Sequence, residues 1–329
     1  MAPMFGGAIG HNPHDTLVRY TFSRLEAVAI ALRRVIDPAL WPCIDFDSLE
    51  ALPTVDADCW LRNRRADLRF KVDLVDRGVR VSILVAIEHQ STLDTLLACR
   101  MHVYVGDMWI RFAHDCSTST TVPAVLPILL AQRPAGKTPR RLSSLFGLTP
   151  KLRRLLGPTV DLELRVDDLS GSVLDDPMAR PGPLALVELT RALLHAHGNP
   201  SALTPERMAT LAPQFDILLN QSPPLGTHDV RALWQYVVKV FKPDSALRTL
   251  IVESVSKEAK QMYITIADAL RAEGRAEALL DVLEHRALPV SPSMRDRLLA
   301  THDEAQLQRW LRRALTIDSA DELFEATGH

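Results

Sequence analysis

The chain has 329 residues, of which 47% are hydrophobic and 24% charged, and its formal net charge is −2. This composition is typical of an ordinary globular protein, and the small net charge argues against a protein that coats nucleic acid through its overall charge. The four cysteines show no Cys-x-x-Cys spacing, which favours free thiols in a reducing cytoplasm over a zinc site or a disulfide framework. The longest apolar run, residues 122–131, is too short to cross a membrane, and the N-terminus lacks a basic segment followed by an apolar one. We therefore expect a cytoplasmic protein with no membrane partner.

The N-terminal part of the chain predicts one helix. Residues 1–12 are expected to be disordered, and an amphipathic pattern then runs from Asp15 to Ile36. Pro38 and Pro42 would end this helix.

Residues 66–90 predict a β-hairpin. Apolar and polar residues alternate strictly over residues 66–74, and Gly78 marks a tight turn before a second, largely apolar segment. If Arg77 and Gly78 form a two-residue loop, every pair on one face is apolar. The pairs are Leu68–Ile87, Phe70–Val85, Val72–Ile83 and Leu74–Val81. Burial of this face would fix the register, because a slip by one residue would mismatch every pair.

The same register places two acids opposite each other. Asp67 would face Glu88 on the other side of the hairpin, with Gln90 two residues further along. Like charges placed directly opposite destabilise a strand pair, and a divalent cation such as Mg²⁺ or Mn²⁺, bound by oxygen ligands, would compensate them. Two alternatives stay open. Both acids could be solvated at frayed strand ends, or a three-residue loop could put them on opposite faces.

A helix and further strands are expected after the hairpin. Ser91 is a candidate N-cap for a helix that runs to about His114, on which Arg100 and Tyr104 share a face. Residues 122–130 are almost continuously apolar, as expected of a strand that is buried on both faces. Residues 159–166 are a candidate edge strand.

The segment between the last two strands is basic. Residues 116–160 contain no Asp or Glu, and such a patch could hold several phosphates, although a solvated loop and helix face would show the same pattern. Its basic side chains are Arg133, Lys137, Arg140, Arg141, Lys151, Arg153 and Arg154.

The composition changes after Asp176, where several prolines mark a boundary. The remainder reads as helical, and the candidate helices are 184–197, 205–219, 229–242 and 244–286, the last broken near Gly274, followed by short helices over 294–324. The predicted organisation is a disordered segment over 1–12, an α/β core over 13–176, a helical region over 177–288 and a small helical module over 289–329.

The order of short motifs resembles a nuclease family. Asp67 followed by Glu88-His89-Gln90 is similar to the core of the PD-(D/E)XK nucleases, specifically the recombination-promoting nuclease branch, also described as YhgA-like transposases. The segments that carry the resemblance are Pro13-His14-Asp15, Ala66-Asp67-Leu68, Ile87-Glu88-His89-Gln90-Ser91, Arg100 with Tyr104 and Trp109, and residues 122–130. The resemblance covers residues 11–170 and implies a restriction-endonuclease-like mixed sheet flanked by helices, followed here by an all-helical C-terminal region.

The resemblance also implies roles for single residues. Asp67 and Glu88, with the backbone carbonyl of His89, would bind Mg²⁺ or Mn²⁺ in a DNA endonuclease linked to recombination or mobile elements. Gln90 would position the attacking water, and Asp15 would approach from the first helix to add a ligand or a water contact. The side chains expected to contact nucleic acid are Arg69, Arg100, Lys137, Arg140, Arg141, Lys151, Arg153 and Arg154.

The chain departs from this pattern after its third strand. The branch often continues there into Tyr-His-Gly, whereas this sequence has Ala131-Gln132 followed by Arg133. The alternative function is therefore a catalytically inactive nuclease fold that binds nucleic acid or protein. A homodimer through the C-terminal helices is also predicted, because cutting both DNA strands often requires two sites.

Overall fold

The computed structural model describes residues 12–53, 68–91, 94–116, 121–132 and 140–324. The chain divides into two compact units, Met1–Ser254 and Val255–His329. The segment predicted to be disordered lies outside the described residues except for Asn12. The domain boundaries that we placed at residues 176 and 288 remain predictions.

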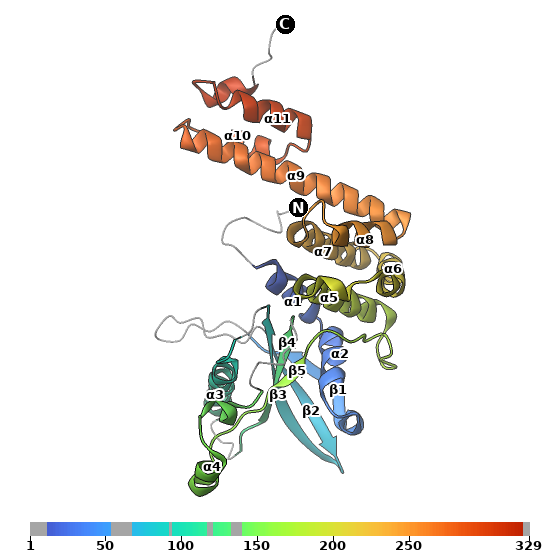
Figure 1. The fold of residues 1–329 in the computed structure, drawn as a ribbon, viewed down its shortest axis with the longest axis vertical. Coiled ribbons are helices and arrows are strands. Elements are labelled where there is room, and N and C mark those ends of the chain that lie inside the picture. The colour runs from blue at the N-terminus through green and yellow to red at the C-terminus, as the bar shows by residue number, and fades with distance from the viewer. Residues whose placement is uncertain (1–11, 54–67, 92–93, 117–120, 133–139, 325–329) are drawn as a thin grey trace. The chain divides into compact units, whose positions relative to one another are not determined.

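The described residues of the first unit form a five-stranded mixed sheet in the order β1-β2-β3-β4-β5 (Figure 1). Its strands are β1 (Ile44–Ala51), β2 (Leu68–Asp76), β3 (Val79–Gln90), β4 (Ala124–Ala131) and β5 (Arg165–Asp167). The first three strands are antiparallel, whereas β3, β4 and β5 run parallel. The predicted mixed α/β sheet is confirmed, and its parallel strands end together at one edge.

The predicted hairpin register is confirmed over the whole described ladder. The four apolar pairs occur as expected, from Leu68 opposite Ile87 to Leu74 opposite Val81. Arg77 and Gly78 both have positive φ, 47° and 81°, which suits a two-residue loop whose twist matches that of the strands. Asp67 is outside the described residues, so the predicted pair of Asp67 and Glu88 lies one step beyond the ladder.

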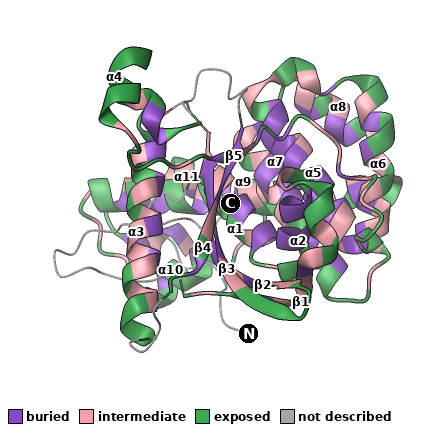
Figure 2. Ribbon diagram, turned by 90° about the horizontal axis from the view of Figure 1, so that it is seen from below, coloured by how far each residue is buried: buried purple, intermediate pink, exposed green. Residues whose placement is uncertain are grey.

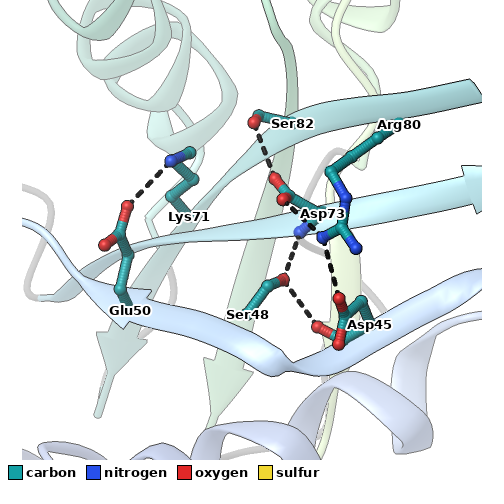
Figure 3. Close-up of polar contacts among 7 residues, drawn as sticks. All are labelled: Asp45, Ser48, Glu50, Lys71, Asp73, Arg80 and Ser82. Atoms are coloured by element: carbon teal, nitrogen blue, oxygen red, sulfur yellow. Dashed lines mark hydrogen bonds and ion pairs between the residues drawn. The ribbon is translucent and has the colours of Figure 1, made fainter.

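Strand β1 was not predicted, and polar side chains join it to the hairpin (Figure 3). The pairing of β1 with β2 shifts between Asp45 and Glu50. In that interval the Ser48 hydroxyl accepts a hydrogen bond from the backbone N–H of Asp73 at 2.8 Å. An ion pair from Lys71 to Glu50, 2.9 Å long, ties the two strands together further along. A bulged edge strand of this kind breaks the alternation of apolar and polar residues by which strands are recognised.

Helices cover the two faces of the sheet. On one face, α3 (Leu97–Asp115) packs on side chains of β3 and β4 that include Ala86 and Leu129. On the other face, α2 (Leu25–Val35) contacts β1 and β5, and α1 (Pro13–Phe22) contacts α5 (Pro181–Gly198) and α7 (Leu225–Val240). In Figure 2 the buried residues of these helices and strands, coloured purple, lie mostly where the helices meet the sheet.

The prediction of one helix over residues 15–36 was wrong, because the chain breaks between α1 and α2. Arg24 has an extended backbone, with φ −90° and ψ 126°. Its guanidinium donates to Asp229 of α7, with a distance of 2.8 Å from Nη1 to Oδ2. The break allows α1 to pack on helices while α2 packs on the sheet.

The start of α3 also differs from the prediction. Ser91 does not cap it, since the helix begins at Leu97 and Leu96 occupies the N-cap position. The Asp94 carboxylate accepts a hydrogen bond from the backbone N–H of Leu96 at 2.8 Å, so a turn built on Asp94 directly precedes the helix. The predicted edge strand over 159–166 is the shorter and later β5.

The C-terminal helices form largely as predicted. The first unit continues through α5, α6 (Pro205–Leu219), α7 and α8 (Ala246–Ser254). The next helix does not break near Gly274 as predicted: Ser256 caps α9 (Lys257–His285), which runs uninterrupted through that glycine. In the second unit, α9 packs with α10 (Pro292–Leu299) and α11 (Glu304–Arg313) around a core that includes Leu283 and Trp310. Within the part of the chain that the structure describes, no helix has the length and hydropathy to cross a membrane.

Candidate functional site at the carboxyl end of β3

Two of the predicted site residues lie together at the end of β3. Glu88 and Gln90 are two residues apart, so they share a face of the strand, and the Gln90 amide donates to the Glu88 carboxylate at 3.1 Å. Glu88 is 6% exposed. Taking a carboxylate this far out of water costs free energy unless hydrogen bonds or an opposite charge compensate it. A buried acid at a strand end therefore indicates a built polar site rather than a frayed terminus.

Arg100 of α3 supplies a positive charge at this site. Its Nη2 lies 3.4 Å from Oε1 of Glu88, and its Nη1 lies 3.1 Å from Oδ2 of Asp94. The Arg100 side chain is 44% exposed, so the guanidinium reaches the buried carboxylate from the solvent side. It is thus placed both to compensate Glu88 and to meet an anion from solution.

Arg69 lies deeper on the same face of the sheet. It is opposite Ala86 in the hairpin and is buried against α3. Burial lowers the pKa of the Arg69 guanidinium, whereas the nearby Asp107 and Tyr104 of α3 raise it. The structure places this predicted nucleic-acid contact in the layer between sheet and helix, not on an exposed surface.

Asp15 approaches the end of β3 from the opposite face. Oδ1 of Asp15 is 2.9 Å from Nδ1 of His89, whose side chain is fully buried. Because successive side chains of a strand point to opposite faces, the His89 ring and the Glu88 carboxylate lie on different sides of the sheet. The helix α1 therefore brings Asp15 to the predicted strand end, where its described partner is the His89 ring.

His14 sits beside Asp15 in a cluster of aromatic rings. Its Nδ1 is 2.8 Å from the hydroxyl of Tyr236, and its ring centre is 4.4 Å from that of His197. Burial, followed by the charges of His197 and His89, lowers the pKa of His14 to about 4, against the raising effect of Asp15. His14 is consequently neutral near pH 7 and serves as a hydrogen-bonding group of the fold.

The predicted metal site extends beyond the described residues. Asp67, its second carboxylate, and Lys137 of the basic segment both fall in undescribed ranges. Among the residues that are described, no group of three or more His, Cys, Asp or Glu side chains could hold a metal ion. Glu88, the His89 carbonyl and Asp15 are the described members of the predicted ligand set.

Gln132 is a polar residue of this region that was not among the predicted site residues. It follows β4, and its backbone N–H donates to the carbonyl of Gln90 at 3.0 Å. Its side chain is fully buried, and within the described ranges the nitrogen and oxygen of its side-chain amide have no hydrogen-bond partner. The signal was present in the sequence, since a strand that follows a helical crossover runs parallel to its neighbour and ends at the same edge.

The basic segment forms a short helix, α4 (Pro150–Leu156), after a 3₁₀ turn at Leu142–Leu145. Arg141 is engaged by acids that follow the segment, with Nη2 2.7 Å from Oε2 of Glu163. Arg153 donates to the backbone carbonyl of Ser143 at 3.1 Å. Lys151 and Arg154 are exposed, as is Arg140. Of the predicted basic patch, Arg140, Lys151 and Arg154 therefore remain exposed on or near α4.

The fold and the site define a mixed α/β protein with a polar centre where its parallel strands end, joined to a helical region. Residues 12–211 match the model of the family described as putative transposase, YhgA-like, and the chain belongs to this family. Membership points to a DNA-related function in mobile elements. No curated protein and no solved structure matches the chain.

Proposed function

We propose that this protein is a metal-dependent DNA endonuclease of the PD-(D/E)XK type. The observation that carries the proposal is the buried Glu88 carboxylate, hydrogen-bonded to Gln90 at the end of β3. The described part of the hairpin ladder ends at the pair Leu68 and Ile87, and the next pair in that register would be Asp67 and Glu88. Two carboxylates in those positions would repel each other unless a cation lay between them.

The donors in this region suit a hard divalent ion. Carboxylate and carbonyl oxygens are the ligands that Mg²⁺ and Mn²⁺ prefer, and Glu88, the His89 carbonyl and Asp67 would provide them. When bound, the ion supplies a Lewis acid that activates water and neutralises charge on the phosphate.

The remaining side chains would orient water and substrate. Gln90 would hold the attacking water by hydrogen bonding, because a neutral amide donates and accepts but exchanges no proton near pH 7. Arg100 would bind a phosphate oxygen of the substrate, since its guanidinium already lies between Glu88 and solvent.

Plasmid cleavage with Mg²⁺ or Mn²⁺ tests the proposal. We expect Glu88→Gln and Asp67→Asn each to reduce the cleavage rate on the order of 10²-fold. The matched control is Glu50→Gln, because Glu50 is an exposed carboxylate of the same sheet whose partner is Lys71. Wild type should also gain thermal stability with Mn²⁺, and both site variants should lose that gain. Equal residual cleavage in wild type and Glu88→Gln would refute the assignment.

A second candidate function is an inactive nuclease fold that binds nucleic acid or protein. The observation that favours it is the end of β4, where Ala131-Gln132 stands in place of the Tyr-His of the resembling branch. This protein would bind DNA without cutting it, and Mn²⁺ would leave its melting temperature unchanged.

A further inference from the structure

The helix α4 is specified by its caps and not by burial. Thr149 accepts a hydrogen bond from the backbone N–H of Leu152 at 3.3 Å, Pro150 occupies the first turn, and Gly157 ends the helix with φ 79°. None of the seven residues of α4 is buried, as its almost uniform exposed colour in Figure 2 shows. N-caps, N-terminal proline and C-terminal glycine are the signals that hold a short helix together without core contacts. The sequence thus maintains a preformed helix that the fold does not use for packing.

The exposed surface of α4 carries three leucines. Leu152, Leu155 and Leu156 are 51%, 73% and 62% exposed. Their spacing of three and four residues puts them on one face, which Lys151 and Arg153 border on its two sides, whereas Arg154 lies nearly opposite. Single exposed leucines are ordinary, but three on one side of a seven-residue helix form an apolar ridge with a basic border.

The charges around this ridge decide which partner it fits. Lys151, Arg153 and Arg154 are all on α4, and the helix has no acidic residue. Two copies of α4 packed together would bring these like charges close, and seven helical residues extend only about 10 Å, which is short for a helix that lies in a membrane surface. The phosphates of duplex DNA complement the basic border, and the minor groove accepts apolar side chains between base steps.

We propose that α4 inserts Leu155 and Leu156, flanked by Leu152, into the minor groove of duplex DNA while Lys151, at the border of this face, contacts an adjoining phosphate. This inference rests on the DNA-directed function proposed above and specifies how the duplex is held. Insertion of apolar side chains unstacks a base step and bends the duplex, so the protein would bend the DNA that it binds.

The two kinds of side chain make separable contributions. The leucines act on DNA shape and carry no charge, so they set the bend and leave the salt dependence alone. The basic residues neutralise phosphates, and each contact adds about 0.9 to the slope of log affinity against log salt concentration.

The test uses a DNA duplex with a fluorophore at each end, so that energy transfer reports both binding and bending. The protein is the full chain carrying Glu88→Gln, and divalent metal is left out so that the duplex is not cut. The double variant Leu155→Ser, Leu156→Ser should lower the affinity for DNA about 10-fold, because it loses the apolar contact with the base step. It should also abolish the bend and leave the salt slope unchanged. Lys151→Gln should lower the salt slope by about 0.9. The control is Leu315→Ser, because Leu315 is as exposed as Leu156 but belongs to the second unit. Unchanged circular dichroism and melting temperature would show that the variants fold, as expected for side chains without buried contacts.

Three results would overturn this proposal. They are an undiminished bend in the leucine variant, a dimer of the parent chain that the leucine variant abolishes, and binding to vesicles of anionic lipid in preference to DNA. The endonuclease proposal fails separately, because a wild-type chain that bends DNA through α4 and does not cut it would refute only the catalytic assignment.

Discussion

The carboxylate of Asp15 lies 2.9 Å from Nδ1 of His89, on the face of β3 opposite the Glu88 carboxylate. Glu88 and His89 are consecutive, so the end of this strand is held from both sides. Arg100 of α3 reaches Glu88 on one side, and α1 reaches His89 on the other. The position of the His89 carbonyl, a predicted metal ligand, thus depends on a contact made by the N-terminal helix.

The first prediction separates two roles for Asp15. If Asp15 acts through His89, Asp15→Ala should lower the free energy of unfolding by about 1–3 kcal/mol, because it removes a hydrogen-bond partner of a buried ring. Asp15→Asn should leave Mn²⁺ affinity within a factor of two of wild type. Urea denaturation and calorimetric titration measure the two quantities, with Asp47→Asn, at an exposed position of β1, as the control. A tenfold loss of Mn²⁺ affinity in Asp15→Asn would instead make Asp15 a ligand.

The second prediction concerns pH. The pKa of His14 is lowered from 6.5 to about 4, so between these values the unfolded chain binds a proton that the folded chain excludes. The free energy of unfolding should therefore rise with pH from about 4 to 6.5, and this contribution is lost as the pH falls through that window. His14→Gln, whose amide can still bond to Tyr236, should reduce the slope. Urea titrations at intervals of pH 0.5 test this, and an unchanged slope would assign the dependence to other groups.

The third prediction compares a buried ion pair with an exposed one. Arg191 of α5 donates to both carboxylate oxygens of Asp167 at the end of β5, with 2.9 Å from Nη2 to Oδ1, and both side chains are about 2% exposed. Asp167→Ala should cost about 3–5 kcal/mol of unfolding free energy, because it leaves the guanidinium buried without its counterion. Arg80, an exposed side chain that reaches Asp45 and Asp73 (Figure 3), is the contrasting case. Arg80→Ala should leave stability nearly unchanged, since water screens such pairs. Equal losses in the two variants would contradict the argument from burial.

The features predicted correctly from the sequence are those that depend on local patterns. The alternation over residues 66–74 and the turn at Gly78 determined the hairpin register, because burial of one face permits a single register. The break between α1 and α2 was missed because no proline or glycine marks it, and the contact made there joins Arg24 to Asp229, a residue more than two hundred positions away. The site was predicted in part: Glu88 and Gln90 share a strand face, which spacing alone reveals. The contact of Asp15 with His89 and the burial of Gln132 depend on tertiary packing, which the sequence does not encode locally.

The fourth prediction uses two glycines with opposite surroundings. Gly274 lies in the middle of α9, where a Cβ would meet nothing within 4 Å. Gly274→Ala should raise the free energy of unfolding by about 0.5–1 kcal/mol, because alanine loses less conformational entropy in a helix. Gly226, in the first turn of α7, is the contrasting case, since a Cβ there would overlap the backbone carbonyl oxygen of Leu218 in α6. Gly226→Ala should lower the free energy of unfolding by about 1–3 kcal/mol, because the backbone of α6 cannot move aside as a flexible side chain would.

Trp310 is the tryptophan of the second unit and the other four belong to the first, so fluorescence of each glycine variant with and without Trp310→Phe separates the two effects during urea denaturation. The Gly274 variant should shift the transition of the second unit upward, and the Gly226 variant should shift that of the first unit downward. A destabilised Gly274→Ala would mean that the glycine serves a bend or a contact of α9, as the sequence pattern first indicated. A Gly226→Ala variant as stable as wild type would mean that α6 and α7 can separate at that point without loss, which their close backbone approach argues against.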